Sequence, residues 1–271
     1  MTSLDQAWQA AADPRRRIGH AVEFHATIGS TNDRARAALT EPGGDGLAVV
    51  ADLQTAGRGR QGRTWVSPAG RNLAVSIGFV PHLAVERIGL LGLAVAVAVR
   101  DACAAAVDAP PPGIRWPNDI VASDGLKLAG LLVETSLAGT RVAEAVIGVG
   151  INVNWRRHEM PLEIAARATS LAELAGADLD RPSLLRHLLD RVDAEVAALE
   201  GGGTPVDRFR AASVLDGRWV TVDLGAEQVE GRVLGIGEGG ELRIEAERGV
   251  RELGIGEVIW VRDAAAVEVA R

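Results

Sequence analysis

Cysteine and lysine are both nearly missing from this chain of 271 residues. The single cysteine, Cys103, excludes a disulfide framework and any metal site that needs several cysteines. The first twenty residues contain no apolar segment of the signal-peptide type. The apolar run at residues 88–99 is too short to span a bilayer and is typical of a buried helix. We therefore expect a cytoplasmic protein with no membrane partner.

Lysine is scarcer than any other charged residue type. Of the 29 basic residues only Lys127 is a lysine, so the remaining 28 are arginines. A genome that favours arginine codons would produce this ratio, because the exchange is harmless at most surface positions. It is not harmless where a compact, flexible point charge is needed. Lys127 is therefore a candidate for a task specific to lysine, and its chance survival is the alternative.

The overall composition is that of a soluble globular protein, with 47% hydrophobic and 24% charged residues. The net charge of −7 argues against a general nucleic-acid binder, which would carry a basic face, so we expect no DNA partner. The length fits one large domain, alone or together with a small one.

The hydrophobic pattern predicts an α+β fold, a mixed sheet with packed helices followed by a small β-barrel. We expect helices at 84–107 and after Asp180, and longer strands at 46–55, 72–80, 119–135 and 143–154. After about residue 212 the pattern changes to short alternating strands with glycine turns, typical of a barrel. The predicted organisation is a lead-in at 1–20, a catalytic domain at 21–211 and a barrel domain at 212–271.

The segment at residues 57–64 satisfies two phosphate-loop patterns at once, the G-x-G-x-x-G dinucleotide fingerprint and a Walker A loop with arginine in place of lysine. Both patterns require a helix directly behind the loop. Pro68 and Gly70 make such a helix implausible, and no acidic residue follows at the distance that the dinucleotide fold needs. The sequence context therefore excludes both interpretations.

What remains is a loop with three arginines, Arg58, Arg60 and Arg63, between glycines. Glycine lets backbone N–H groups approach a ligand, and guanidinium groups fit phosphate oxygens. In a chain of net negative charge this concentration favours an anion site over a solvated surface loop. Because the three like charges repel one another, we expect the loop to order over an anion.

The end of the strand at 143–154 has a second feature that favours ligand binding. Its odd-numbered residues from 147 to 151 are apolar, and its even-numbered residues are Gly148, Gly150, Asn152 and Asn154. Because side chains alternate along a strand, glycines and amides share one face, which leaves room for a ligand. A polar strand end is the alternative. The residues from Ser30 to Asp33 admit two interpretations as well, a helix N-cap or part of a site.

The turn of the hairpin at 119–135 decides whether the side chains of Asp119 and Lys127 lie on the same face of the sheet. A two-residue turn at Asp124 and Gly125 would place the two side chains on opposite faces of the sheet. A three-residue loop with Gly125 in the left-handed region would place them on the same face. Lys127 alternates with Ala129, so we expect its stem on an apolar face and an anion, Asp119 or a ligand, beside its ammonium group.

Together these segments resemble the bacterial biotin–protein ligases. The motifs that carry the resemblance run from about residue 22 to 262 in the order of that family: Ser30-Thr31-Asn32, Gln54 with the loop 57–63, Trp65, Ser67-Pro68, Asn72-Leu73, residues 116–119 (WPND), residues 127–130 (KLAG) and Gly150-Ile151-Asn152. The arginine loop, WPND and KLAG form a specific combination. The resemblance implies a catalytic domain of the class II synthetase and biotin ligase type, followed by an SH3-like barrel.

The resemblance also implies a reaction in two steps. The carboxylate of biotin attacks the α-phosphate of ATP with the help of Mg²⁺ and forms biotinyl-5′-AMP and pyrophosphate. A lysine of a biotin carboxyl carrier domain of an acyl-CoA carboxylase then displaces AMP. Such chemistry depends on positioning and fixed positive charge more than on covalent catalysis.

The site residues implied by the resemblance fall into three groups. The catalytic residues are Lys127, Arg60 and Asp119. The biotin-binding residues are Ser30, Thr31, Asn32, Gln54, Gly57, Arg58, Gly59, Arg60, Lys127 and Gly130. The residues that hold ATP or the adenylate are Arg58, Arg60, Arg63, Trp65, Asn118 and Asn152. No metal ligand is assigned.

Two features depart from the family pattern. Arg115 stands before Trp116 where lysine is usual, which suggests a supporting role for this charge. The helix-turn-helix of the repressor members is not found in this sequence, so we expect a monofunctional ligase. A lipoate–protein ligase and a non-catalytic ligand-binding regulator are the alternative functions.

Overall fold

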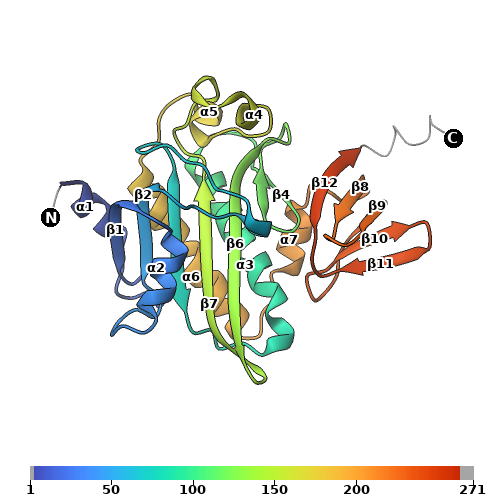
Figure 1. The fold of residues 1–271 in the computed structure, drawn as a ribbon, viewed down its shortest axis with the longest axis horizontal. Coiled ribbons are helices and arrows are strands. Elements are labelled where there is room, and N and C mark those ends of the chain that lie inside the picture. The colour runs from blue at the N-terminus through green and yellow to red at the C-terminus, as the bar shows by residue number, and fades with distance from the viewer. Residues whose placement is uncertain (1–2, 263–271) are drawn as a thin grey trace.

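The protein, seen in a computed structural model that describes residues 3–262, is built on a mixed sheet of seven strands (Figure 1). The strand order is β1-β2-β3-β7-β6-β5-β4. The β1–β2 pair is parallel and the other pairs are antiparallel. The strands are β1 (Val22–Ile28), β2 (Ala48–Gln54), β3 (Leu73–Phe79), β4 (Gly113–Arg115), β5 (Asp119–Val121), β6 (Lys127–Ala138) and β7 (Arg141–Ile151). The predicted mixed sheet is confirmed.

Helices cover both faces of this sheet. The long helices α3 (Gly89–Ala106) and α6 (Arg181–Glu200) pack against each other behind the sheet, and α2 (Thr31–Ala38) lies on the front face (Figure 1). Asp180 begins α6 because its carboxylate accepts the N–H of Ser183 at 3.0 Å. Among residues 3–262, α3 is the one helix long and apolar enough to span a membrane by length and composition. It is shorter than the helix predicted at 84–107, because residues Val85–Arg87 form a separate 3₁₀ turn, and most of it is buried in the core.

The N-terminal residues pack against the sheet as well. Helix α1 (Ser3–Gln9) places Trp8 on Phe24 of β1, with 5.7 Å between the ring centroids. Trp8 and Ile18 belong to the same hydrophobic core as the sheet. The division into a lead-in, a catalytic domain and a barrel domain stays a prediction.

A second sheet follows the short helix α7 (Val206–Ala212) and is antiparallel throughout. Its order is β11-β10-β9-β8-β12, formed by β8 (Trp219–Asp223), β9 (Gln228–Ile236), β10 (Leu242–Ala246), β11 (Gly249–Leu253) and β12 (Glu257–Arg262). The sequence pattern missed β11, because this edge strand is mostly exposed and shows no alternation. The indole N–H of Trp116 donates to Gly240 O at 3.1 Å and joins the two sheets. Residues 263–271 of the predicted barrel lie outside the described residues.

The connection between β5 and β6 is the three-residue loop. Ala122 and Leu126 close it, with the Ala122 N–H donating to Leu126 O at 2.9 Å. Gly125 has φ +81°, in the left-handed region. The prediction that this loop places Asp119 and Lys127 on one face is confirmed, because Lys127 Nζ lies 2.5 Å from Asp119 Oδ1.

The face predicted for Lys127 was wrong in one respect. The pairing of β5 with β6 shifts by one residue between Val121–Lys127 and Ile120–Ala129, which is a β-bulge. The bulge places Ala129 in the core, whereas Lys127 shares the opposite face with Gly130. Lys127 therefore projects from the same face as a glycine and not from the apolar face that simple alternation predicts.

Two short helices cover the end of the sheet where β7 finishes. They are α4 (Leu162–Ala165) and α5 (Leu171–Ala175), which ends at Gly176 with φ +71°. The parallel bridge between Lys127 and Ala168 ties this segment to β6. The short helices bring Ile164 and Arg167 over the face that carries Lys127, where they line the cavity described below.

Candidate active site

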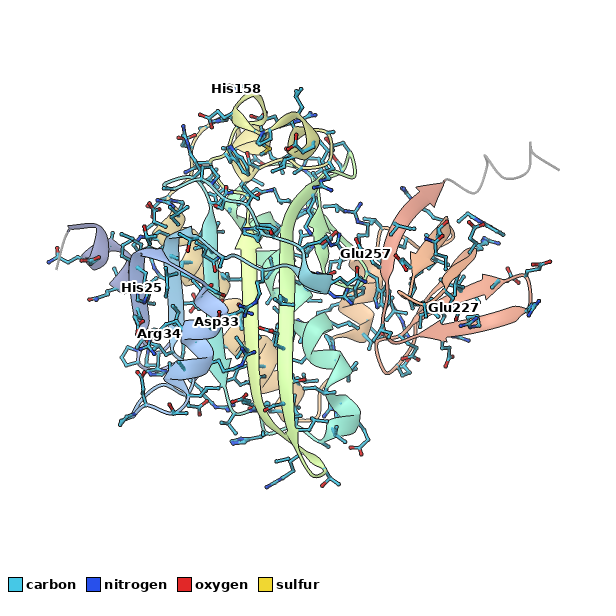
Figure 2. All side chains as sticks on the ribbon, in the orientation of Figure 1. His25, Asp33, Arg34, His158, Glu227 and Glu257 are labelled. Carbon is cyan, nitrogen blue, oxygen red and sulfur yellow. The ribbon has the colours of Figure 1, made fainter. Side chains whose placement is uncertain are left out.

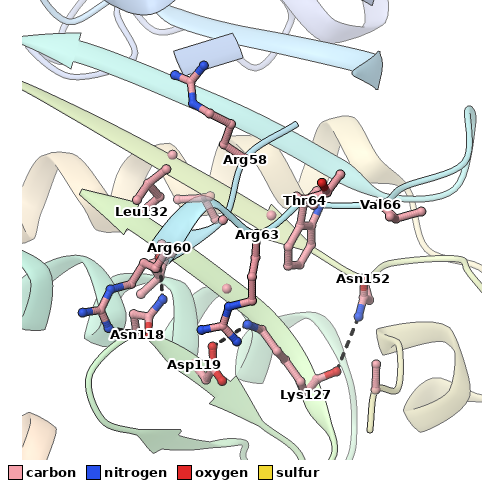
Figure 3. A pocket seen from close by; sticks show the side chains of 18 of the residues that line it. Arg58, Arg60, Arg63, Thr64, Val66, Asn118, Asp119, Lys127, Leu132 and Asn152 are labelled. Carbon is pink, nitrogen blue, oxygen red and sulfur yellow. Dashed lines mark hydrogen bonds and ion pairs between the residues drawn. The ribbon is translucent and has the colours of Figure 1, made fainter. Parts of the chain in front are cut away.

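A cavity of about 440 Å³ lies on the front face of the large sheet, within the range of small-molecule sites. Its walls come from the beginning of α2, the loop 57–65, the strand ends of β5, β6 and β7, and the first residues of β12. Figure 3 labels lining residues of the loop and of these strands, among them Arg60, Asn118 and Lys127. Segments that are distant in the sequence therefore meet in one place.

The glycine face of β7 forms the floor of the cavity, as its alternation predicted. Ile147, Val149 and Ile151 lie in the core, and Gly148 and Gly150 line the cavity. A Cβ atom at Gly150 would lie 2.4 Å from Trp65 Cε2, and one at Gly148 would lie 2.3 Å from Asn32 Oδ1. The missing side chains therefore make room for Trp65 and Asn32 against the sheet.

The polar end of the cavity surrounds the first turn of α2. Gln54 Oε1 accepts the backbone N–H of Thr31 at 2.9 Å and satisfies a donor that the helix cannot pair internally. Ser30 occupies the N-cap position, but its side chain makes no capping hydrogen bond. Of the two interpretations of this segment, the N-cap holds for the backbone position, whereas the Ser30 side chain is among those lining the cavity.

Each arginine of the loop is held by oxygen atoms of the protein. Arg58 makes a bidentate ion pair with Asp33, at 2.6 and 2.8 Å. Arg63 pairs with Glu257, the first residue of β12. Figure 2 labels both carboxylates, Asp33 on α2 and Glu257 on the C-terminal sheet. Two carboxylates from other elements thus compensate the positive charge of the loop. Repulsion among the arginines was therefore the wrong basis for expecting the loop to order over an anion.

Arg60 differs from the other two loop arginines because it is partly buried and has no carboxylate at hydrogen-bond distance. It donates to Asn118 Oδ1 at 3.2 Å and to Gly256 O at 3.1 Å. Burial lowers the pKa of Arg60 from its ordinary value, and the negative charge of Asp119 opposes this shift. A guanidinium held by neutral oxygens retains its attraction for an anionic ligand.

Lys127 lies at the centre of the opposite wall (Figure 3). Asp119 forms two ion pairs. One carboxylate oxygen lies 2.5 Å from Lys127 Nζ, and the other lies 3.1 Å from Arg115 Nη2. The ammonium group also lies 5.8 Å from the centroid of the Trp65 ring, within cation–π distance. Asp119 is thus the anion expected beside the ammonium group of Lys127, and Arg115 pairs with its second oxygen.

Trp65 carries an unsatisfied polar group. Its indole Nε1 is buried and has no hydrogen-bond partner within residues 3–262. Buried polar groups are almost always paired in native proteins, and the exceptions occur often at functional sites. The indole N–H in the cavity wall is therefore a buried donor without a partner among the described residues.

Almost all of the site residues predicted from the sequence line this one cavity. Among them only Gly57 lies outside the lining, behind the loop, where a Cβ atom would approach Trp65 O to 2.7 Å. Asn152 is at the cavity, but its amide donates to Thr169 O at 3.0 Å and so connects backbone segments.

Several lining residues escaped prediction, and Ser76 and Glu257 are two polar examples. Ser76 is a single polar residue in an apolar strand, which is a signal that could have been used. Glu257 belongs to the second sheet, and no local pattern connects it with the loop. Over residues 3–262 there is no cluster of three or more histidine, cysteine or acidic residues that could hold a metal ion.

Comparison with known proteins places the chain in a family. Residues 26–152 match the model of the biotin/lipoate A/B protein ligase family. The chain is 34% identical over 247 residues to a biotin–[acetyl-CoA-carboxylase] ligase of Mycobacterium tuberculosis, covering 89% of each chain. It is 31% identical to the bifunctional ligase/repressor BirA of Bacillus subtilis, covering 87% of this chain and 73% of the relative.

A solved structure agrees with these relatives. The biotin protein ligase of Aquifex aeolicus in complex with biotin and ATP superposes with a TM-score of 0.76 at 30% identity. The match covers 90% of this chain and 99% of the other. The chain belongs to the biotin protein ligases. The family resemblance of the loop, WPND and KLAG motifs is thereby confirmed, and so is the fold class, with a second antiparallel sheet near the C-terminus.

The cavity of this chain has three chemically distinct parts. The cavity has a neutral polar end at Thr31 and Gln54, a cationic middle at Lys127, and a roof formed by the arginine loop. The lipoate–protein ligase and the non-catalytic regulator are not favoured by these relatives.

Proposed function

We propose that this protein is an ATP-dependent biotin–protein ligase that makes biotinyl-5′-AMP and transfers biotin to a lysine of a biotin carboxyl carrier domain of an acyl-CoA carboxylase. One observation carries the proposal. Three arginines and the only lysine of the chain converge on one cavity whose far end consists of uncharged hydrogen-bonding groups. This arrangement suits a ligand with a neutral polar head and a carboxylate that must meet a polyphosphate.

In the first step, a carboxylate oxygen of biotin attacks the α-phosphorus of ATP, the bond to the β-phosphate oxygen breaks, and pyrophosphate leaves. Thr31, Gln54 and Ser30 bind the head group. Lys127 bridges the attacking carboxylate and the α-phosphate and leaves its pairing with Asp119 to do so. Fixed cations that face developing negative charge account for a large part of the rate in such reactions.

Arg58, Arg60 and Arg63 close over biotin and the phosphates. Each of them exchanges its present partner for a ligand oxygen. Trp65 holds the nucleotide, and its free indole N–H adds a donor. Asn118 and Asn152 hold the surrounding backbone, because their amides donate to Leu131 O and Thr169 O.

In the second step, the ε-amine of the acceptor lysine attacks the acyl carbon and AMP leaves with the bonding electrons. Asp119 lies at this wall and assists the incoming amine by accepting its proton. Mg²⁺ belongs to the proposal as part of the substrate MgATP, since Mg²⁺ is commonly bound by one or two carboxylates together with substrate phosphates. Asp119 and Glu257 are the carboxylates at the cavity, and both are engaged by cations of the protein.

Pyrophosphate release tests the proposal. We expect the purified chain to release pyrophosphate from MgATP on addition of biotin and not on addition of lipoate. A carrier domain added afterwards should gain the mass of one biotinyl group. Release with lipoate would indicate a lipoate ligase, and no release with either acid would indicate a regulator. The absence of a DNA or membrane partner stays a prediction.

A further inference from the structure

The Arg58 side chain lines the cavity but points away from its centre. In Figure 3 its guanidinium is directed away from Lys127 and Asp119. Two hydrogen bonds hold it there, from Nη1 to Asp33 Oδ2 at 2.8 Å and from Nη2 to Asp33 Oδ1 at 2.6 Å. Asp33 lies in the first turn of α2 and is not among the lining residues. A cavity arginine is thus bound to a carboxylate outside the cavity.

Both members of this pair are charged. Hydrogen bonding to Arg58 lowers the pKa of Asp33 below its ordinary value, and hydrogen bonding to Asp33 raises the pKa of Arg58. An ionised carboxylate offers a guanidinium the same two-oxygen geometry as the carboxylate or the phosphate of a ligand. Asp33 therefore occupies Arg58 in the way that the anionic group of a ligand would.

Arg58 can leave Asp33 by rotation of its side chain, without unfolding of the loop. The backbone here forms a short antiparallel ladder, in which Arg58 is bridged to Thr64 and the Gly59 N–H donates to Arg63 O at 2.7 Å. Asp33 keeps a cation nearby, because Arg36 Nη1 lies 3.9 Å from its Oδ1. Its side chain is also 57% exposed, so water solvates the released carboxylate. Breaking such an exposed pair costs little free energy.

We propose that Asp33 is a positioning residue that competes with the ligand for Arg58. It holds the guanidinium away from Lys127 until an anionic oxygen of the ligand, from the carboxylate of biotin or from the α-phosphate, takes its place. This inference deepens the proposed function and rests on it, because it requires a ligand that brings an anion into this cavity. Removal of Asp33 should therefore strengthen the binding of anionic ligands, whereas removal of a merely structural residue would not.

Three ligands with the same head group test the inference through their equilibrium affinities for the full chain. Biotinol is neutral, biotin carries a carboxylate, and biotinol-5′-AMP carries a phosphodiester. The affinity for each anionic ligand is divided by the affinity for biotinol, which cancels any effect of a variant on head-group binding. In Asp33→Asn this ratio should rise about two- to fivefold for at least one anionic ligand. The ligand that gains identifies the anion to which Arg58 moves.

Two controls isolate the effect of Asp33 on Arg58. Asp33→Glu keeps the carboxylate and should keep the wild-type ratio. In an Arg58→Gln background, Asp33→Asn should leave the ratio unchanged, because the competition acts through Arg58 and not through the net charge of the cavity. Asp33→Ser also removes the charge and repeats the measurement if Asp33→Asn does not fold.

An unchanged or lower ratio for both anionic ligands in the folded variant would overturn the inference. An equal rise in the Arg58→Gln background would overturn it as well, because the effect would then be one of charge alone. A wild-type protein that binds neither biotin nor biotinol would instead contradict the proposed function.

Discussion

Lys127 is the single residue on which the first chemical step is proposed to depend. Its ammonium lies 2.5 Å from Asp119 Oδ1, and a Cβ atom at Gly130 would lie 2.9 Å from Nζ, so the charge lies directly over a glycine of the cavity wall. A planar guanidinium is wider than an ammonium and does not fit the same position between two anions. The proposed role is therefore expected to require lysine here.

We expect Lys127→Ala to fold normally and to form the adenylate about 10²–10³-fold more slowly, because a fixed cation at the phosphoryl oxygens is removed. Lys127→Arg should be similarly poor although it keeps the charge. Biotin-dependent pyrophosphate exchange measures both variants, with circular dichroism as the control for folding. Wild-type activity in Lys127→Arg would show that any cation suffices.

Gly150 provides a second prediction for a single residue. A methyl group at this position would lie 2.4 Å from Trp65 Cε2, so Gly150→Ala should displace the indole from the floor. We expect altered tryptophan fluorescence and weaker nucleotide binding. Gly92→Ala in α3 is the control, because a Cβ atom there meets nothing within 4 Å, and it should stabilise the helix by about 0.5–1 kcal/mol. Unchanged fluorescence in Gly150→Ala would contradict the arrangement.

Among the elements, the β5–β6 hairpin determines which side chains meet. Its loop requires Gly125 at φ +81°, and a Cβ atom there would contact nothing within 4 Å, so only the backbone conformation demands glycine. Gly125→Ala should cost about 1 kcal/mol of unfolding free energy, and Gly125→Asn less, because asparagine tolerates this region better. Denaturant titration measures the difference. Equal stability of both variants and wild type would indicate a different loop.

The hairpin also shows how far the sequence could predict the site. The turn residues left two loops open with opposite consequences for the face of Asp119, and the structure contains the three-residue loop that the functional interpretation requires. The bulge at Lys127 could not be predicted, because an extra residue in one strand depends on its pairing with β5 and β7. Ser76 and Glu257 were missed for the same reason. Their importance comes from contacts across three elements and not from a local pattern.

The junction of β1 and α2 should make stability depend on pH. Arg34 donates to both oxygens of Glu23 at 2.7 Å, and this hydrogen bonding lowers the pKa of Glu23 below its ordinary value of 4.5. Because the folded-state pKa is depressed, the stabilisation is present above pH 4.5 and is lost as the pH falls through the folded-state pKa.

Glu23→Gln should therefore lower the free energy of unfolding at pH 7, on the order of 1 kcal/mol. The difference from wild type should shrink as the pH falls below 4.5. Glu41→Gln is the control on the same arginine, and its effect should be smaller because Glu41 is more exposed. A difference that stays constant down to acid pH would exclude this ion pair as the cause.

At the scale of the whole molecule, the C-terminal sheet takes part in the site. Glu257 pairs with Arg63, and Gly256 O accepts from Arg60, so the second sheet holds the arginine loop over the first. A domain that contributes only to solubility would not make these contacts. The two sheets also share one hydrophobic core, which keeps Glu257 in place.

Glu257→Gln should therefore speed amide hydrogen exchange in residues 57–63 of the ligand-free protein, because one of the loop's anchors is weakened. Glu227→Gln, which removes an ion pair with Arg251 inside the C-terminal sheet, should leave the loop unchanged. If neither variant alters exchange in the loop, the second sheet does not restrain it.

The scarcity of lysine has a last consequence for an enzyme of this proposed chemistry. A biotinyl-adenylate that escapes is an acylating reagent, and its targets are unprotonated amines. The one side-chain amine of this protein is held in an ion pair with Asp119, at 2.5 Å, and is therefore not a free amine. Arginine covers the remaining basic positions and does not lose its proton in proteins. The side chains of this catalyst thus offer its own reactive intermediate almost nothing to modify, so the leaked reagent is left for other proteins and for water.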